Sequence, residues 1–243
     1  MAAMSPEQPA VAFVHTVAGL APTFNALARD VLPPATRTVH IVDEDLLQDT
    51  IRSGAIRPPT RARLRAYVEF AQRMGLQAVM VTCSSVGPAV DEIAPGAGLP
   101  VLRVDTAMAD EAVRLGRQIG VLGTLSTTLE PTAALIRTRA DQAGREVQVE
   151  ARVAEGAFAA LQQGQTAEHD RRVLEVARAL LGQVDVLVLA QASMARVLEQ
   201  LPAAERGVPV LSSPQLGVQR LAAVLADRPS AAAGTTAASQ PSS

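Results

Sequence analysis

Residues 78–88 read AVMVTCSSVGP, and this stretch decides the fold. The run 78–81 is short, apolar and β-branched, which is typical of a strand covered on both faces of a parallel sheet. The run ends at Cys83, the only cysteine among 243 residues. Residues 86–93 predict the first turns of a helix, in which Pro88 is tolerated near the start. The stretch therefore predicts a thiol between the carboxyl end of a buried strand and the N-terminus of a helix.

Two interpretations of Cys83 follow from this position. A helix N-terminus and free backbone N–H groups can hold a thiol partly as thiolate and can bind an anionic ligand. Alternatively, Cys83 is a small buried hydrophobe, which is the usual role of a lone cysteine. A repeat within the chain favours the first interpretation.

The second half of the chain repeats the order of elements in the first half. Strands are expected at 11–15, 39–42, 78–81 and 101–104, and again at 120–124, 147–149, 185–190 and 209–211. Helices are expected at 22–32, 60–74 and 107–117, and again at 131–139, 168–181 and 216–225, with Thr60 as an N-cap. Equivalent elements of the two halves are about 108 residues apart. The pattern predicts an α/β fold of two pseudo-symmetric, doubly wound parallel-sheet (Rossmann-like) halves.

These elements also divide the chain into domains. We expect a disordered N-terminus at 1–9, a first half at 10–106 completed by 213–228, a second half at 107–212, and a disordered tail at 229–243. Ligands of such sheets bind beyond the carboxyl ends of the strands. The site is therefore expected in an interdomain cleft, with Cys83 and Gln191 facing each other across it.

Composition excludes several classes of function. The formal net charge is −2 and aromatic residues are few, so neither a basic surface nor a stacking platform indicates nucleic acid. All 22 cationic residues are arginine, which removes lysine Schiff bases, pyridoxal phosphate and the P-loop lysine. The three histidines lack metal-ligand spacing, so no metal is expected.

The sequence also indicates where in the cell the protein acts. No apolar run approaches the ~20 residues that span a bilayer, and the N-terminus lacks a signal-peptide pattern. A single cysteine fits a reducing compartment. We therefore expect a cytoplasmic protein with no membrane partner, while assembly of identical chains stays open.

Four motifs resemble the aspartate/glutamate (Asp/Glu/hydantoin) racemase superfamily over residues 11–227. They are VTCSS at 81–85, GVLGT at 120–124 with Thr127 and Thr128 behind it, EGAF at 155–158, and LAQASMA at 189–195. The resemblance implies a cofactor-independent enzyme in which two cysteines flank a carbon next to a carboxylate. One cysteine removes a proton and the other returns it. The first carries over to Cys83, whereas the second falls on Gln191.

That substitution limits the chemistry, because glutamine is neither an acid nor a base near neutral pH. Ser193 is not a substitute without a base beside it. The resemblance thus implies an isomerase- or racemase-like enzyme that acts on a small carboxylate through Cys83, by proton transfer or nucleophilic attack. The alternatives are a carbon–carbon lyase like the arylmalonate decarboxylases and a non-catalytic small-carboxylate binding protein.

Hydroxyl and amide residues near the strand ends are the candidate substrate ligands. Ser84 and Ser85 could stabilise a carboxylate and its enediolate, or could only cap the following helix. Thr124, Thr127 and Thr128 enter a helix in an arrangement that suits an anion, although capping explains one of them equally well. The remaining candidates lie at strand ends: Thr16, Gln191, Ala192 and Ser193.

Three further residues are weaker candidates. His15 ends the first strand and could face the cleft as an acid or an orienting group, or could be a structural histidine. Asp43 and Glu155 follow the second strand of each half, where they could face the cleft or only pair with arginines at its rim.

Overall fold

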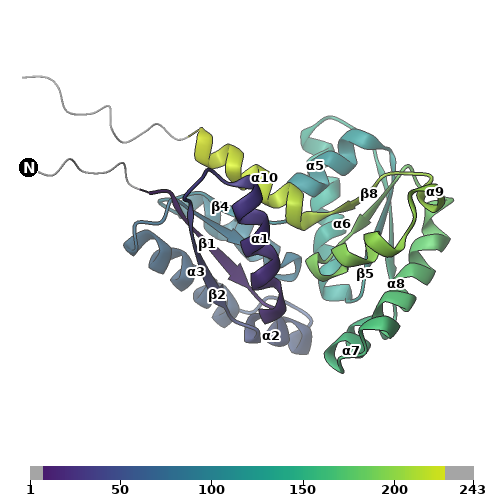
Figure 1. Ribbon diagram of the computed structural model, residues 1–243, viewed down its shortest axis with the longest axis horizontal. Helices are drawn as coiled ribbons and strands as arrows, with labels where there is room; N and C mark the ends of the chain where they lie inside the picture. Colours follow the sequence, from purple (N-terminus) through teal and green to yellow (C-terminus); the bar gives the residue numbers. More distant parts are fainter. Residues whose placement is uncertain (1–7, 228–243) are drawn as a thin grey trace, which may run out of the picture.

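The computed structural model describes residues 8–227, which form two α/β lobes (Figure 1). The segments expected to be disordered, 1–9 and 229–243, lie outside this range apart from residues 8 and 9. Each lobe contains a four-stranded sheet in which all described strand pairs are parallel. The first sheet has the order β2-β1-β3-β4 and the second has the order β6-β5-β7-β8. The prediction of two doubly wound parallel-sheet halves is confirmed.

The strands of the two sheets are short, and their bounds are as follows. The first sheet contains β1 (Ala10–His15), β2 (Arg37–Val42), β3 (Ala78–Val81) and β4 (Val101–Arg103). The second contains β5 (Gln118–Gly123), β6 (Gln148–Val153), β7 (Val186–Leu189) and β8 (Val210–Ser212). The residues of β1, β3 and β7 are all buried, as expected for central strands that read as continuous apolar runs.

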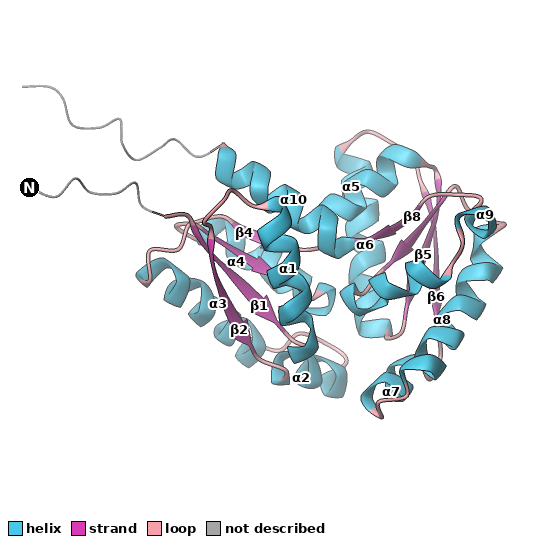
Figure 2. Cartoon of the chain, viewed as in Figure 1, coloured by secondary structure: helices cyan, strands magenta, loops and turns pink. Residues whose placement is uncertain are grey.

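Helices cover both faces of the first sheet (Figure 2). Successive strand residues point to opposite faces, so β1 builds two cores. Val11 and Phe13 pack in a cluster with residues of α1 (Ala21–Val31) and α10 (Ser213–Ala226). Ala12 and Val14 pack in a second cluster, with residues of α2 (Asp45–Ser53), α3 (Pro58–Arg73) and α4 (Gly87–Ile93).

The second sheet is covered in the same way. Ile119 and Val121 of β5 pack with α5 (Thr106–Leu115) and α6 (Ser126–Gln142), while Leu122 packs with α8 (Thr166–Leu181). Shorter elements complete the lobe: helices α7 (Ala157–Gln162) and α9 (Ala203–Arg206), and the 3₁₀ segment η4 (Ala192–Gln200). The first lobe has three 3₁₀ segments, η1 (Ala18–Leu20), η2 (Ser84–Val86) and η3 (Ala94–Gly96).

The last helix crosses between the lobes. From β8 in the second sheet, α10 runs to the first lobe and lies beside α1 (Figure 1). A Cβ atom at Gly217 of α10 would lie 2.8 Å from the carbonyl oxygen of Val104, so glycine is required for this approach. Val218 and Leu221 belong to a core cluster of the first lobe. This packing supports our proposal that the last helix, α10, completes the first half.

The structure corrects three local expectations. Helices α2 and α7, which follow the second strand of each half, were not expected because each is short. Thr60 does not cap α3, since that helix begins at Pro58 and the Thr60 hydroxyl donates to Asp49 Oδ2 at 2.8 Å. Two prolines without N–H groups start the helix, which leaves little for a capping side chain to bind.

The repeat is regular except at one strand. β5 begins at 118, 108 residues after β1 begins at 10, and β7 follows β3 by the same offset (186 against 78). β6 begins at 148, 111 residues after β2 at 37, because α6 is longer than α1. The counterpart of Val39 is therefore Glu150 and not Val147, since they pair with the equivalent residues Ala12 and Gly120. Within residues 8–227, none of the helices is long and apolar enough to span a bilayer.

Candidate active site

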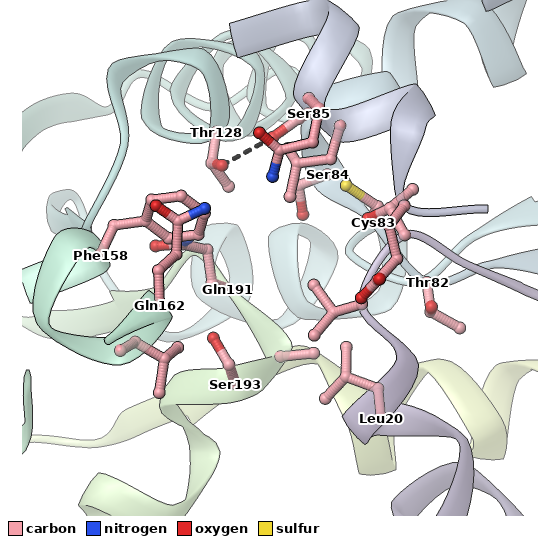
Figure 3. Close-up of a pocket in the computed structure, with 17 residues that line it drawn as sticks. Leu20, Thr82, Cys83, Ser84, Ser85, Thr128, Phe158, Gln162, Gln191 and Ser193 are labelled. Carbon is pink, nitrogen blue, oxygen red and sulfur yellow. Dashed lines mark hydrogen bonds between the residues drawn. The ribbon is translucent and has the colours of Figure 1, made fainter. Parts of the chain in front are cut away.

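A cavity of about 390 Å³ lies between the lobes, beyond the carboxyl ends of the strands (Figure 3). The segments after β1, β3 and β7 contribute its polar lining, together with Thr128 of α6 and the short helices α2 and α7. The residues that line it are Thr16, Val17, Leu20, Glu44, Leu47, Gln48, Thr82, Cys83, Ser84, Ser85, Thr128, Phe158, Leu161, Gln162, Gln191, Ala192 and Ser193. The position matches the rule for ligand sites in open α/β sheets.

Cys83 stands on the first-lobe wall of this cavity. It has extended backbone geometry after β3, and η2 and α4 follow it immediately. The Thr16 hydroxyl and the N–H groups of Ser85 and Val86 donate to its sulfur. Burial raises the pKa of the Cys83 thiol, and these donors oppose that rise without overcoming it. The raised pKa favours the protonated thiol, and the partial thiolate stays a prediction.

Gln191 stands on the second-lobe wall, held by Thr124. The backbone N–H of Thr124 donates to Gln191 Oε1 at 2.6 Å, and its hydroxyl donates to the same oxygen at 2.8 Å. The amide oxygen is thus occupied, while the Nε2 N–H groups have no described hydrogen-bond partner. Figure 3 shows this amide and the Cys83 thiol on different sides of one cavity. Thr124 itself does not line the cavity and acts on it through Gln191.

Hydroxyl groups gather near Cys83. Ser85 Oγ and Thr128 Oγ1 lie 2.7 Å apart in a buried hydrogen bond that joins the two lobes (Figure 3). Ser84 lines the same wall, and Thr16, Ala192 and Ser193 complete the predicted residues that reach the cavity. Thr127 does not reach it, and its Oγ1 is buried with no hydrogen-bond partner. Of the three threonines expected to bind an anion, only Thr128 is in position.

His15 does not face the cavity but belongs to a buried hydrogen-bond chain. The Thr82 hydroxyl donates to the carbonyl oxygen of Val14 at 3.2 Å, so it accepts from His15 Nδ1 at 2.9 Å. His15 Nε2 is then the acceptor for His40 Nδ1–H, also at 2.9 Å. Burial, with a smaller contribution from the charge of His40, lowers the pKa of His15 to about 4. His15 is thus a neutral residue that links β2, β1 and the start of the Cys83 loop.

Two other predicted candidates lie outside the cavity lining. Asp43 is buried against Arg63 and accepts a 2.6 Å hydrogen bond from the Tyr67 hydroxyl. Glu155 is exposed, and its backbone carbonyl accepts from Arg172 at 3.0 Å. The three-residue shift at β6 explains why Glu155 is not equivalent to Asp43. The backbone N–H of Asp43 donates to His15 O, and the N–H of Ala154 donates to Gly123 O in the same way, so Ala154 is the counterpart of Asp43.

Sequence reasoning missed the residues that the unexpected helices bring to the site. Glu44, Leu47 and Gln48 come from the start of α2, whereas Phe158, Leu161 and Gln162 come from α7. Only Phe158 was signalled, as the end of the EGAF motif. Among residues 8–227, no group of three or more His, Cys, Asp or Glu side chains could hold a metal ion.

Comparison with known proteins agrees with this architecture. The sequence model described as Asp/Glu/Hydantoin racemase matches residues 14–221. Solved structures with similar folds include a glutamate racemase isoform from Bacillus anthracis (TM-score 0.68, 18% identity, 91% of this chain and 83% of that chain). An allantoin racemase from Klebsiella pneumoniae has a TM-score of 0.67 and 18% identity, over 90% of this chain and 88% of that chain. An aspartate racemase from Picrophilus torridus has a TM-score of 0.67 and 12% identity, over 88% of this chain and 94% of that chain. No curated protein matches the sequence significantly.

Proposed function

The chain belongs to the Asp/Glu/hydantoin racemase family, and we propose that it is a cofactor-independent enzyme that uses one thiol, Cys83, at a carbon next to a carboxyl group. Family membership supports an isomerase that acts on small carboxylates. The observation that carries the finer proposal is the lining of the cavity, where the only cysteine of the chain lies opposite an amide.

The substrate carboxylate has suitable partners beside the thiol. The Ser84 hydroxyl and the free N–H groups of Gln191 can donate to its oxygens. Ser85 and Thr128 share one hydrogen bond, so at most one of their two hydroxyls has a hydrogen left to donate. These donors would also stabilise the enediolate that forms when charge moves from the carbon onto the carboxyl group. Preorganised donors of this kind each contribute on the order of 3 kcal/mol to transition-state stabilisation.

Proton transfer through Cys83 follows from its protonation state. A thiol that keeps its proton at neutral pH can give it to an enediolate carbon, after which the thiolate regains a proton from solvent. In the reverse direction, the thiolate removes a proton from the same face. Gln191 cannot deliver a proton from the other side. We therefore propose that protons reach the substrate carbon from the Cys83 face only, so that proton exchange by Cys83 keeps the configuration of this carbon and does not racemise it.

A second candidate function is carbon–carbon bond cleavage with reprotonation. The raised pKa of Cys83 favours a proton donor, and a decarboxylated substrate leaves an enediolate that needs one proton on one face. In that reaction, the bond to the departing carboxyl group breaks, carbon dioxide leaves, and the Cys83 proton replaces it. A thiol in either role must stay reduced, so we expect a reducing compartment such as the cytoplasm.

The test is a substrate panel followed by NMR in deuterated water, with malonates, hydantoins, amino acids and maleate. The expected result is deuterium at the carbon next to the carboxyl group, or loss of a carboxyl group with deuterium in its place. Cys83→Ala should lower the rate by about 10²- to 10⁴-fold, because positioned acid–base groups contribute that much. Cys83→Ser, which keeps a similar shape, is the matched control for packing. Full activity of the folded Cys83→Ala variant would overturn the proposal.

A further inference from the structure

The cavity has an unusual balance of charge. Of the residues that line it, Glu44 is the one with a formal charge at neutral pH, and none of the described lining residues is an arginine or a histidine. A ligand carboxylate bound beside Cys83 is therefore met by neutral donors. A second carboxylate on the same ligand would find no cation in this lining, and it would also be repelled by Glu44.

Glu44 differs from the acidic residues around it. Asp43 pairs with Arg63, Asp45 pairs with Arg63 at 2.9 Å, and Asp49 pairs with Arg57. Among the described residues, Glu44 forms no ion pair. Glu44 is an exposed residue whose carboxylate reaches solvent, and it is the acidic residue of this segment that lines the cavity without an ion-pair partner.

The Glu44 side chain is nevertheless held in place. Its Oε1 accepts the backbone N–H of Ala18 at 3.1 Å, which links the start of α2 to the loop after β1. Oε2 has no described partner and remains available for a ligand. Thr16, two residues before Ala18, donates to the Cys83 sulfur, so the same loop connects the thiol and Glu44.

The lining also has an apolar part, beside further neutral polar side chains such as Gln48 and Gln162. Val17, Leu20 and Leu47 lie on the first-lobe side, and Phe158 and Leu161 lie on the second-lobe side. A ligand that fills this space buries an apolar substituent, which stabilises the complex through the hydrophobic effect. The lining thus offers three kinds of partner: neutral donors, one carboxylate and an apolar wall.

We propose that Glu44 is a specificity-determining residue that selects a substrate with one carboxylate, a cationic amino group and an apolar substituent, and that it excludes dicarboxylates. This inference rests on the proposed function, since the carboxylate is placed beside Cys83. In this arrangement the ligand ammonium donates to Glu44 Oε2 while the apolar substituent packs between the two lobes.

The test uses protection of Cys83 from iodoacetamide in the full chain, because a single cysteine makes the labelling site unambiguous. The probes are both enantiomers of leucine, 4-methylpentanoate as the analogue without an amino group, and both enantiomers of glutamate. Labelling rates of the parent protein, Glu44→Gln and the control Glu146→Gln are each normalised to the rate without probe. Glu44→Gln keeps the acceptor for Ala18 N–H and removes only the charge, while Glu146 is exposed and outside the cavity.

The expected result is that one leucine enantiomer protects Cys83 about tenfold more tightly than 4-methylpentanoate, and that glutamate protects weakly. Glu44→Gln should abolish the tenfold preference, and Glu146→Gln should retain it. An unchanged preference in Glu44→Gln, or glutamate that protects as well as leucine, would overturn the role of Glu44 and leave the proposed function standing. If none of the carboxylates slows labelling, both proposals are wrong.

Discussion

The loops after β3 and β7 are equivalent in the repeat, but they carry different chemistry. Cys83 and Gln191 are 108 residues apart, as are Thr16 and Thr124. The Thr16 hydroxyl donates to the Cys83 sulfur, and the Thr124 hydroxyl donates to Gln191 Oε1. Each half thus holds its strand-end side chain with a threonine at the equivalent position. The repeat has kept the supporting residue while one half has a thiol and the other an amide.

The two loops are also supported differently on their outer side. Arg103, whose side chain is 4% exposed, forms two 2.9 Å hydrogen bonds with Asp105 and also pairs with Asp91. Its guanidinium packs so closely on Gly87 that a Cβ atom there would lie 2.4 Å away. The second loop is tied to α8 by Arg196, which is 35% exposed and pairs with Asp170 at 2.7 Å. The thiol loop therefore rests on a buried ion pair and the amide loop on a partly exposed one.

This difference predicts unequal costs for matched substitutions. Arg103→Met leaves the fully buried Asp105 without its partner, which should lower the free energy of unfolding by about 3–5 kcal/mol. Arg196→Met should cost much less, about 1 kcal/mol, because Arg196 is partly exposed and the buried Asp170 keeps its hydrogen bond from Gln200. Urea denaturation of both variants measures the contrast. Equal losses would show that burial does not distinguish the two supports.

A second contrast is the histidine pair, which exists only in the first half, since Gly123 is the counterpart of His15. The pKa of His15 is lowered to about 4 by burial, so the unfolded chain binds a proton below pH 6.5 that the folded protein does not bind. The free energy of unfolding should therefore rise with pH between 4 and 6.5. As the pH drops from 6.5 to 4, protonation of His15 in the unfolded chain should lower this free energy by up to about 3 kcal/mol.

Denaturation at pH 7 and at pH 4.5 measures this dependence. The matched variant is His15→Gln, whose side chain can still donate to Thr82 but does not titrate. It should have a flatter stability profile over the same range than the parent protein. An identical slope in both proteins would show that His15 is not the group responsible.

Much of the fold could be predicted because it depends on patterns that the sequence displays directly. The buried runs 78–81 and 186–189 are too short and too β-branched for helices, and their repetition indicated two sheets. Helices α2 and α7 are only nine and six residues long, so their periodicity was too brief to detect. Missing them removed Glu44 and Gln162 from the predicted site. The hydrogen bond between His15 and His40 was also unpredictable, since it depends on the pairing register of β1 and β2.

We propose that the thiol of Cys83 acts on one face of the substrate carbon and that Gln191 occupies the position of a second thiol. Gln191→Cys tests it most directly. The hydroxyl and N–H of Thr124, which now bind Gln191 Oε1, would be available to the new sulfur. The measurement is the enantiomeric composition and deuterium content of the product formed by each protein in deuterated water.

We expect a single enantiomer from the parent enzyme, with deuterium delivered from the Cys83 face, and racemisation of that product by Gln191→Cys. Racemic product from the parent enzyme would contradict this proposal, because another group would then protonate the second face. A Gln191→Cys variant that is folded and active but never racemises the product would contradict it equally, since positions 83 and 191 would not address the same carbon.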